Sequence, residues 1–122
     1  MRSFEDLELY KQCREFRKGI SILVKSFPKE EKYRLIDQMI RCSRSITANI
    51  AEGHGRYHYQ ENIQFCRQSR GSLMETLDHL LCAYDENYID ETQLQEFRSC
   101  YDHCLKLVNG YIYYLKKQKK GE

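Results

Sequence analysis

The chain has 122 residues, 41% of them hydrophobic and 31% charged, with a formal net charge of only +2 at pH 7. This length supports one core, so we expect residues 1–122 to form a single domain. One proline and six glycines argue against a turn-rich β-sandwich and favour long helices. No apolar run approaches the roughly 20 residues of a membrane span, and no signal peptide is recognisable, so we expect a cytoplasmic protein without membrane contact.

Hydrophobic periodicity predicts a first helix at about residues 4–26 and a second at about 28–54. Ser3 suits an N-cap for the first helix, and Pro28 suits the start of the second. The first helix carries an apolar seam of Leu9, Cys13, Phe16, Ile20, Leu23 and Phe27. The second carries Leu35, Met39, Cys42, Ile46 and Ile50, and it is expected to end near Gly53 and Gly55.

A third helix is predicted at about residues 58–85 and a fourth at about 90–118. The third helix has an apolar row of Tyr59, Ile63, Cys66, Leu73, Leu77, Leu80 and Tyr84. The fourth has Leu94, Phe97, Tyr101, Cys104, Val108, Tyr111 and Leu115. Long helices joined by short turns run antiparallel to their neighbours, which predicts an all-α, up-down-up-down four-helix bundle.

Most of the six cysteines fall on these apolar rows, where cysteine acts as a small hydrophobic side chain. Cys100, His103 and Cys104 could share one helix turn, but zinc needs a fourth ligand, and no second close pair exists. We therefore predict packing cysteines, with neither a metal nor a cofactor.

A polar row follows the buried stripe of the second helix: Gln38, Arg41, Ser45, Asn49, Glu52 and Arg56. At about 100° per residue these side chains fall within one arc beside the stripe. In a structural interpretation, Asn49 and Glu52 hydrogen-bond across a helix or subunit boundary, and Glu52 forms a partly buried ion pair with Arg41 or Arg56.

A functional interpretation joins arginines of the second and third helices into one anion-binding patch: Arg41, Arg44, Arg56, Arg67 and Arg70. Tyr57 and Tyr59, at the turn between these helices, could stack on unpaired bases. Residues 32–70 carry a surplus of basic side chains and residues 71–104 a surplus of acidic ones. Such asymmetry can steer an anionic partner or orient subunits, so both interpretations stay open.

Two segments resemble conserved blocks of a bacterial four-helix-bundle family, first named for proteins encoded in intervening sequences of 23S ribosomal RNA genes. Residues 49–53, Asn-Ile-Ala-Glu-Gly, with Ser45-Ile46 before them and Gly55-Arg56 after them, are similar to its signature. Gly71-Ser72-Leu73 with Glu75 is similar to its second block. Further matches are Phe4 with Leu7, and Phe27-Pro28 with Glu31 and Tyr33; departures are Thr47 for a common Pro, His58 for a capping Ser and Ser69 for a usual Ala.

The resemblance implies an up-down bundle without enzymatic activity. It also implies kinship with the accessory variability determinant proteins of diversity-generating retroelements. Those relatives form barrel-like homopentamers and present basic surfaces to nucleic acid and to a reverse transcriptase. The resemblance therefore implies three kinds of partner: other copies of this chain, with a pentamer as one candidate assembly, RNA or DNA, and another nucleic-acid-handling protein. The blocks also predict a structural polar junction of Ser45, Asn49, Glu52, Gly53, Ser72 and Glu75.

Two functions are consistent with these patterns. The first is nucleic-acid binding through the arginine patch by a homo-oligomer. The alternative is a scaffold or protein-interaction module whose polar row serves subunit assembly only. Tyrosines on several sides of the fourth helix suggest self-association through the first or fourth helix. Catalysis has little support, since Glu52, His54 and His58 suit a helix-capping turn better than an acid–base site.

Overall fold

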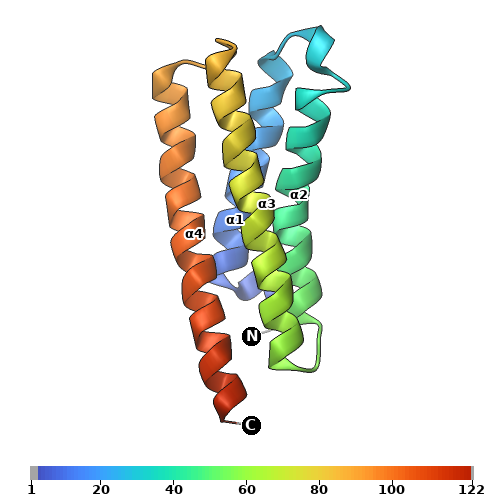
Figure 1. Ribbon diagram of the computed structural model, residues 1–122, viewed down its shortest axis with the longest axis vertical. Coiled ribbons are helices and arrows are strands. Elements are labelled where there is room, and N and C mark those ends of the chain that lie inside the picture. The colour runs from blue at the N-terminus through green and yellow to red at the C-terminus, as the bar shows by residue number, and fades with distance from the viewer. Residues whose placement is uncertain (1–2, 122) are drawn as a thin grey trace.

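The computed structural model describes residues 3–121, and these form helices and turns without any β-strand. Four long helices run alternately up and down (Figure 1). Their bounds are Glu8–Leu23 (α1), Leu35–His54 (α2), Tyr59–Asp85 (α3) and Glu91–Lys120 (α4). Each helix packs against its two neighbours in the ring order α1, α2, α3, α4. This arrangement confirms the predicted all-α four-helix bundle.

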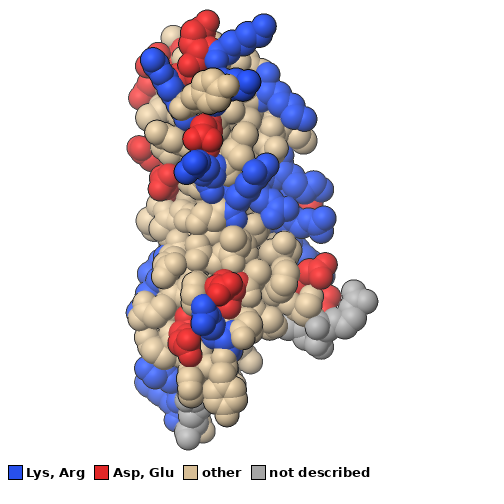
Figure 2. Space-filling view, turned by 90° about the vertical axis from the view of Figure 1, so that its right-hand side faces the viewer, with Lys and Arg blue, Asp and Glu red and all other residues tan. Residues whose placement is uncertain are grey.

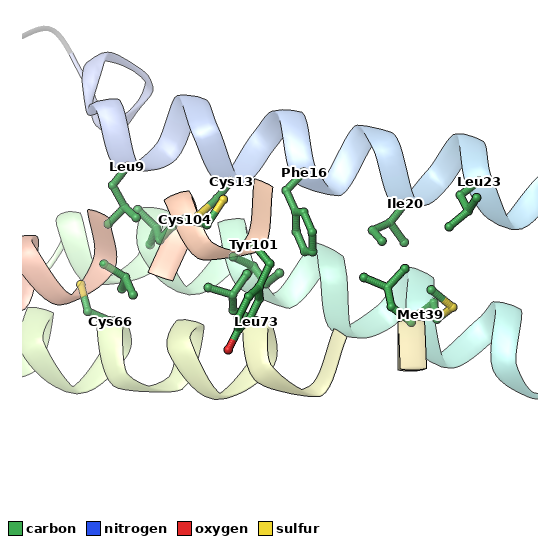
Figure 3. Close-up of a cluster of buried hydrophobic side chains, with 14 of the residues drawn as sticks. Leu9, Cys13, Phe16, Ile20, Leu23, Met39, Cys66, Leu73, Tyr101 and Cys104 are labelled. Atoms are coloured by element: carbon green, nitrogen blue, oxygen red, sulfur yellow. The ribbon is translucent and has the colours of Figure 1, made fainter. Parts of the chain in front are cut away.

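The core lies along the bundle axis, where the predicted apolar seams meet. Figure 3 shows side chains of α1, among them Phe16 and Ile20, pointing toward residues of the other helices. Ile20, Met39 and Leu80 have no exposed surface at all. Burying a side chain of this size contributes about 1.5–3 kcal/mol. All six cysteines are free, and Cys13, Cys42, Cys66 and Cys104 are buried, which confirms their predicted packing role.

Hydroxyl groups inside the bundle are bonded to backbone carbonyls. Ser69 of α3 donates to the carbonyl oxygen of Ile46 in α2 at 2.7 Å. Thr76 donates to the Ser72 carbonyl one turn earlier in its own helix, at 2.8 Å. Among the described residues, no buried side-chain nitrogen or oxygen lacks a hydrogen-bond partner. The α2–α3 boundary is therefore closely packed and fully hydrogen-bonded.

The first two predicted helices begin later than expected. Residues 4–6 form a separate 3₁₀ helix, capped by Ser3 through a capping box with Asp6, and α1 begins only at Glu8. The second helix was predicted from residue 28 but begins at Leu35. Residues 28–34 are mostly polar and exposed, so an α-helix there would gain no buried stripe.

Short 3₁₀ helices therefore fill the connection between α1 and α2, at Val24–Ser26 and Lys29–Glu31. A contact with the α3–α4 loop holds this connection in place. The hydroxyl of Tyr88 donates to a carboxylate oxygen of Glu31 at 2.9 Å. The ring of Tyr88 also lies 5.4 Å from that of Phe27, centroid to centroid. The two loops at this end of the bundle are thus joined.

The turns at the ends of α3 explain its length. His58 precedes α3 as an N-cap without a side-chain hydrogen bond, as expected where a capping serine is missing. At the other end Asn87 adopts a positive φ of 64°, and Asp90 then forms a capping box with Gln93 to start α4.

No described helix has the length and apolar character needed to cross a membrane.

Candidate nucleic-acid interface

Within the chain, Asn49 and Glu52 do not bond across a helix boundary, and their predicted role at a subunit boundary stays a prediction. Asn49 donates its amide to the Ser45 carbonyl and to the Ser45 hydroxyl, at 2.9 and 3.0 Å, within its own helix. The contact that crosses to α3 comes from Ser72, whose hydroxyl donates to Ser45 at 2.9 Å. Asn49 thus orients the hydroxyl that receives the interhelical bond.

The charged members of the row are paired along the helix surface. Arg56 lies 2.7 Å from Glu52 and 3.9 Å from Glu61, and all three side chains are about half exposed. Arg41 pairs with Asp37 at 3.2 Å. Glu52 therefore pairs with Arg56, as one alternative predicted, but at the surface of the chain and not in a partly buried position.

Gly53 allows the close approach of α2 and α3 at this junction. A Cβ at this position would lie 2.7 Å from Asn62 Oδ1 and 2.8 Å from the Cβ of Phe65. Gly71, in contrast, has nothing within 4 Å of its would-be Cβ and is exposed in the middle of α3. Of these two glycines, only Gly53 is required by packing within the chain.

The five arginines of the predicted patch do not form one surface. Arg44 lines a groove of about 360 Å³ with Arg17 and Lys18 of α1. Arg67 lines a different groove of about 530 Å³ between α3 and α4. In the ring order of the helices these two grooves face opposite sides of the bundle. Arg70 turns to α4, where it donates to Asn109 at 2.8 Å.

The α3–α4 groove is the more strongly basic of the two. Its lining contains five cations, one exposed tyrosine and no carboxylate among the described residues: Gln60, Ile63, Arg67, Tyr113, Lys116, Lys117, Lys119 and Lys120. Within residues 3–121, no carboxylate oxygen lies within 4.0 Å of the charged nitrogens of these cations. Lys117 lies over the ring of Tyr113, 4.7 Å from its centroid, and Tyr113 remains 62% exposed.

A second cavity, of about 910 Å³, opens at the same end of the bundle. It is lined by Leu7, His54, Arg56, Tyr57, His58, Tyr59, Asn62, Tyr111, Tyr114 and Leu115. Tyr57 is 92% exposed, whereas Tyr59 is half-buried, so the two tyrosines of the turn do not present equal stacking surfaces. Tyr111 and Tyr114 are stacked with centroids 5.9 Å apart.

Charge is unevenly spread over the side of the bundle formed by α2. Figure 2 shows Lys and Arg gathered near mid-height and an uncharged band below them. The sequence of α2 agrees, since no charged residue lies between Arg44 and Glu52. This side therefore offers a neutral band between a basic region and the Glu52–Arg56 pair.

The buried thiols are not prepared for catalysis. Burial raises the pKa of Cys66 to about 11. The pKa of Cys104 is raised to about 12. Its hydrogen bond with Cys100 lowers this pKa, but its hydrogen bond with Cys13 and its burial together raise it by more. Such thiols stay protonated near neutral pH and are poor nucleophiles. His103 is exposed whereas Cys104 is buried, so the trio with Cys100 does not converge.

Comparison with known proteins places this fold. The family model of the 23S rRNA-intervening sequence protein matches residues 5–110. The chain belongs to this family. A crystal structure from Bacteroides thetaiotaomicron VPI-5482, described as a protein of unknown function from the S23 ribosomal protein family, has the same fold. It is 24% identical, with a TM-score of 0.79 over 86% of this chain and 95% of the other. A search of curated proteins gave no match.

Membership of the 23S rRNA-intervening sequence protein family confirms the resemblance drawn from the two sequence blocks. The matched region contains the Ser45–Ser72 contact, Gly53 and Arg67. It stops at residue 110, before Tyr113 and the lysines that complete the α3–α4 groove. The predicted patch did not include those lysines. Their three- and four-residue spacing on one helix face was the signal for a groove.

Proposed function

We propose that this chain is a non-enzymatic protein that binds nucleic acid, RNA or DNA, in the groove between α3 and α4. The observation that supports the proposal is a groove lined by five cations, without a carboxylate among the described residues. The proposal moves the interface from the predicted α2–α3 patch to α3–α4. Arg67 is the one member of the original arginine set that lines this groove.

The ion pairs that the arginines form, or do not form, support this choice. Arg41 and Arg56 already lie beside carboxylates, so a phosphate would compete with Asp37, Glu52 and Glu61 for them. Arg67 and the α4 lysines have no such competitor among residues 3–121. Each of these cations that contacts a phosphate releases counterions and adds to the salt dependence of binding.

Aromatic side chains beside the groove favour single strands over duplex. Tyr113 is exposed in the groove itself, and the tyrosine-lined cavity lies at the same end of the bundle. Stacking of a base on an aromatic ring contributes about 1–3 kcal/mol and needs an unpaired base. We therefore expect unpaired regions of RNA, or single-stranded DNA, to bind more tightly than duplex of the same sequence.

Fluorescence anisotropy with a labelled single strand tests the proposal. The variant Arg67→Glu/Lys116→Glu/Lys117→Glu reverses three groove charges, and we expect its affinity to fall at least about tenfold. The matched control Lys18→Glu/Arg41→Glu/Arg44→Glu makes the same change in net charge on the α1–α2 side. Equal losses in both variants, or no binding by the wild type at low salt, would contradict a binding groove at α3–α4.

Assembly of identical subunits is the alternative function, and Gly71 is the observation that favours it. A glycine inside an exposed helix costs about 1 kcal/mol relative to alanine, and among the described residues no other part of the chain lies within 4 Å of a Cβ placed on Gly71. Met74, one turn further on, is 48% exposed. A second copy packed closely against this part of α3 would account for both features.

The remaining parts of the proposal follow from the resemblance. We propose a homo-oligomer, a pentamer if this chain assembles like the accessory variability determinant proteins, with a second nucleic-acid-handling protein as a further partner. A ring would repeat the groove and raise the avidity for a long polyanion without new contacts. Light scattering measures the mass of the assembly, and a monomeric mass at micromolar concentration would contradict this part. A nucleic-acid partner also fits the expected cytoplasmic location.

A further inference from the structure

Three side chains with metal-binding chemistry meet at the boundary of α2 and α3. They are the thiol of Cys42, the carboxylate of Glu75 and the imidazole of His79, and their ligand atoms all lie within 4.8 Å of one another. Among the described residues they are the only such group of three or more. None of them belongs to the Cys100, His103 and Cys104 trio on α4, which the sequence analysis rejected as a metal site.

The backbone arrangement explains how the three groups converge. Glu75 and His79 are four residues apart on α3, so both point to the same side, and His79 Nε2 lies 3.3 Å from a carboxylate oxygen of Glu75. Cys42 enters from α2, and its sulfur lies 3.1 Å from the hydroxyl of Thr76, which sits between the other two ligands along α3. Packing of α2 on α3 therefore fixes the thiol beside the pair.

The donor set matches zinc. Zn²⁺ takes sulfur from cysteine, nitrogen from histidine and oxygen from carboxylates, at about 2.0–2.3 Å, in tetrahedral geometry. Two tetrahedral ligands at such distances lie about 3.3–3.8 Å apart, so the His79–Glu75 separation already suits a shared ion. Calcium and magnesium, which prefer oxygen ligands, fit a thiol and an imidazole poorly.

Burial gives the group one protected side and one open side. Cys42 is 6% exposed, and the side chain of His79 is 13% exposed, whereas that of Glu75 is 57% exposed. A metal held here would have its thiolate and imidazole sheltered by the bundle, with the fourth position directed to solvent on the Glu75 side. Binding converts the thiol to thiolate and releases its proton to water.

We propose that Cys42, Glu75 and His79 bind one Zn²⁺ ion that links α2 to α3, with a water molecule as the fourth ligand. The site is separate from the nucleic-acid groove, so neither proposal depends on the other. Because a metal bound only by the folded chain stabilises it, zinc should raise the melting temperature.

Cobalt substitution tests this proposal directly. Reduced, chelator-treated protein is titrated with Co²⁺, and we expect a thiolate-to-cobalt charge-transfer band in the near ultraviolet that saturates at one equivalent. The band should vanish in Cys42→Ser and weaken at least about tenfold in apparent affinity in Glu75→Gln and His79→Gln. Glu75 is exposed, so Glu75→Gln keeps the fold even if Cys42→Ser destabilises it.

Matched controls use the same residue types elsewhere. Cys82→Ser and His103→Gln change an exposed cysteine and an exposed histidine outside the group, and both should keep the band and the zinc-dependent rise in melting temperature. A wild type without a charge-transfer band overturns the proposal. So does a band that survives in Glu75→Gln and His79→Gln at full affinity, since neither side chain would then be a ligand, and so does a band that survives in Cys42→Ser, since another cysteine would then supply the sulfur.

Discussion

The hydroxyl of Ser72 donates a hydrogen bond to the hydroxyl of Ser45 at 2.9 Å and thereby joins α3 to α2. Ser45 in turn accepts the amide of Asn49 at 3.0 Å, so the three side chains form a short chain of bonds. All three belong to the two sequence blocks that resemble the family, and the spacing in those blocks places the three side chains where they link α2 to α3.

This chain of bonds predicts coupling between Ser45 and Ser72. We expect Ser72→Ala to lower the free energy of unfolding by about 0.5–1.5 kcal/mol, and Ser45→Ala by a similar amount. The double variant should lose less than the sum, because each single change already breaks the shared bond. Urea unfolding of the four proteins measures the difference. Strict additivity would mean that the bond contributes nothing.

The two glycines of α2 and α3 should respond oppositely to alanine. In Gly53→Ala the new Cβ meets Asn62 Oδ1 and the Cβ of Phe65 at 2.7 and 2.8 Å, so we expect a loss of about 1–3 kcal/mol. In Gly71→Ala the new Cβ meets no described atom within 4 Å apart from its chain neighbours and its own helix backbone, so the isolated chain should gain about 0.5–1 kcal/mol.

Light scattering tests whether Gly71 lies in a contact between subunits, and thermal unfolding tests its effect on the stability of the helix. If the bundle assembles through this face, Gly71→Ala should reduce the mass seen by light scattering even as it stabilises the helix. Gly110, also without a neighbour within 4 Å, provides the matched control in α4. A loss of mass in Gly110→Ala alone would place the subunit contact elsewhere.

Burial of Cys66 predicts a loss of stability at alkaline pH. Its thiol keeps a pKa of about 11 in the folded chain, against the ordinary 9.0 when unfolded. Between these values the unfolded state has lost the proton while the folded state retains it, so stability is full below pH 9.0 and falls as the pH rises toward 11. The slope is about 1.4 kcal/mol per pH unit.

Comparison with Cys66→Ala isolates this contribution, since other groups also titrate in the same range. The variant should be less stable near neutral pH because a cavity is left, yet its stability should fall less steeply between pH 9.0 and 11. Chemical unfolding at closely spaced pH values gives both slopes. Parallel curves would show that Cys66 loses its proton equally easily in both states.

Tyr113 predicts a preference for unpaired bases. We expect Tyr113→Ala to weaken binding of a single strand by about 1–3 kcal/mol while binding of duplex changes little, because only unpaired bases can stack on the ring. Tyr33→Ala is the control, since Tyr33 is 83% exposed in the connection that precedes α2, away from the groove. Equal losses for single strand and duplex would argue against stacking.

Helix periodicity was sufficient to predict the bundle and most of its core. The seams of α1 and α4 repeat every three or four residues, and such spacing leaves no other arrangement for Phe16 or Val108 than the interior. The start of α2 was harder to predict, because Pro28 is compatible both with a helix start and with the 3₁₀ turn that the structure contains. In the structure, residues 28–34 are exposed, and Glu31 is held by Tyr88, a residue distant in sequence.

The candidate site was predictable only in part, and the reason is geometric. A row of arginines on α2 and another on α3 can share a face or diverge, depending on how far each helix is rotated about its axis. The structure directs Arg44 to α1 and Arg67 to α4. The proximity of Cys42 to His79 could not be predicted for the same reason, since it depends on the register of α2 against α3.

The ring order of the helices has a kinetic consequence. Three of the four principal helix contacts join elements that follow one another along the chain, and the contact of α1 with α4 closes the ring. Loops between neighbouring helices close at little entropic cost, so a helical hairpin such as α2–α3 should form early and the whole chain should refold quickly. We expect docking of α1 onto α4 to come last, so substitutions there should accelerate unfolding more than they slow refolding.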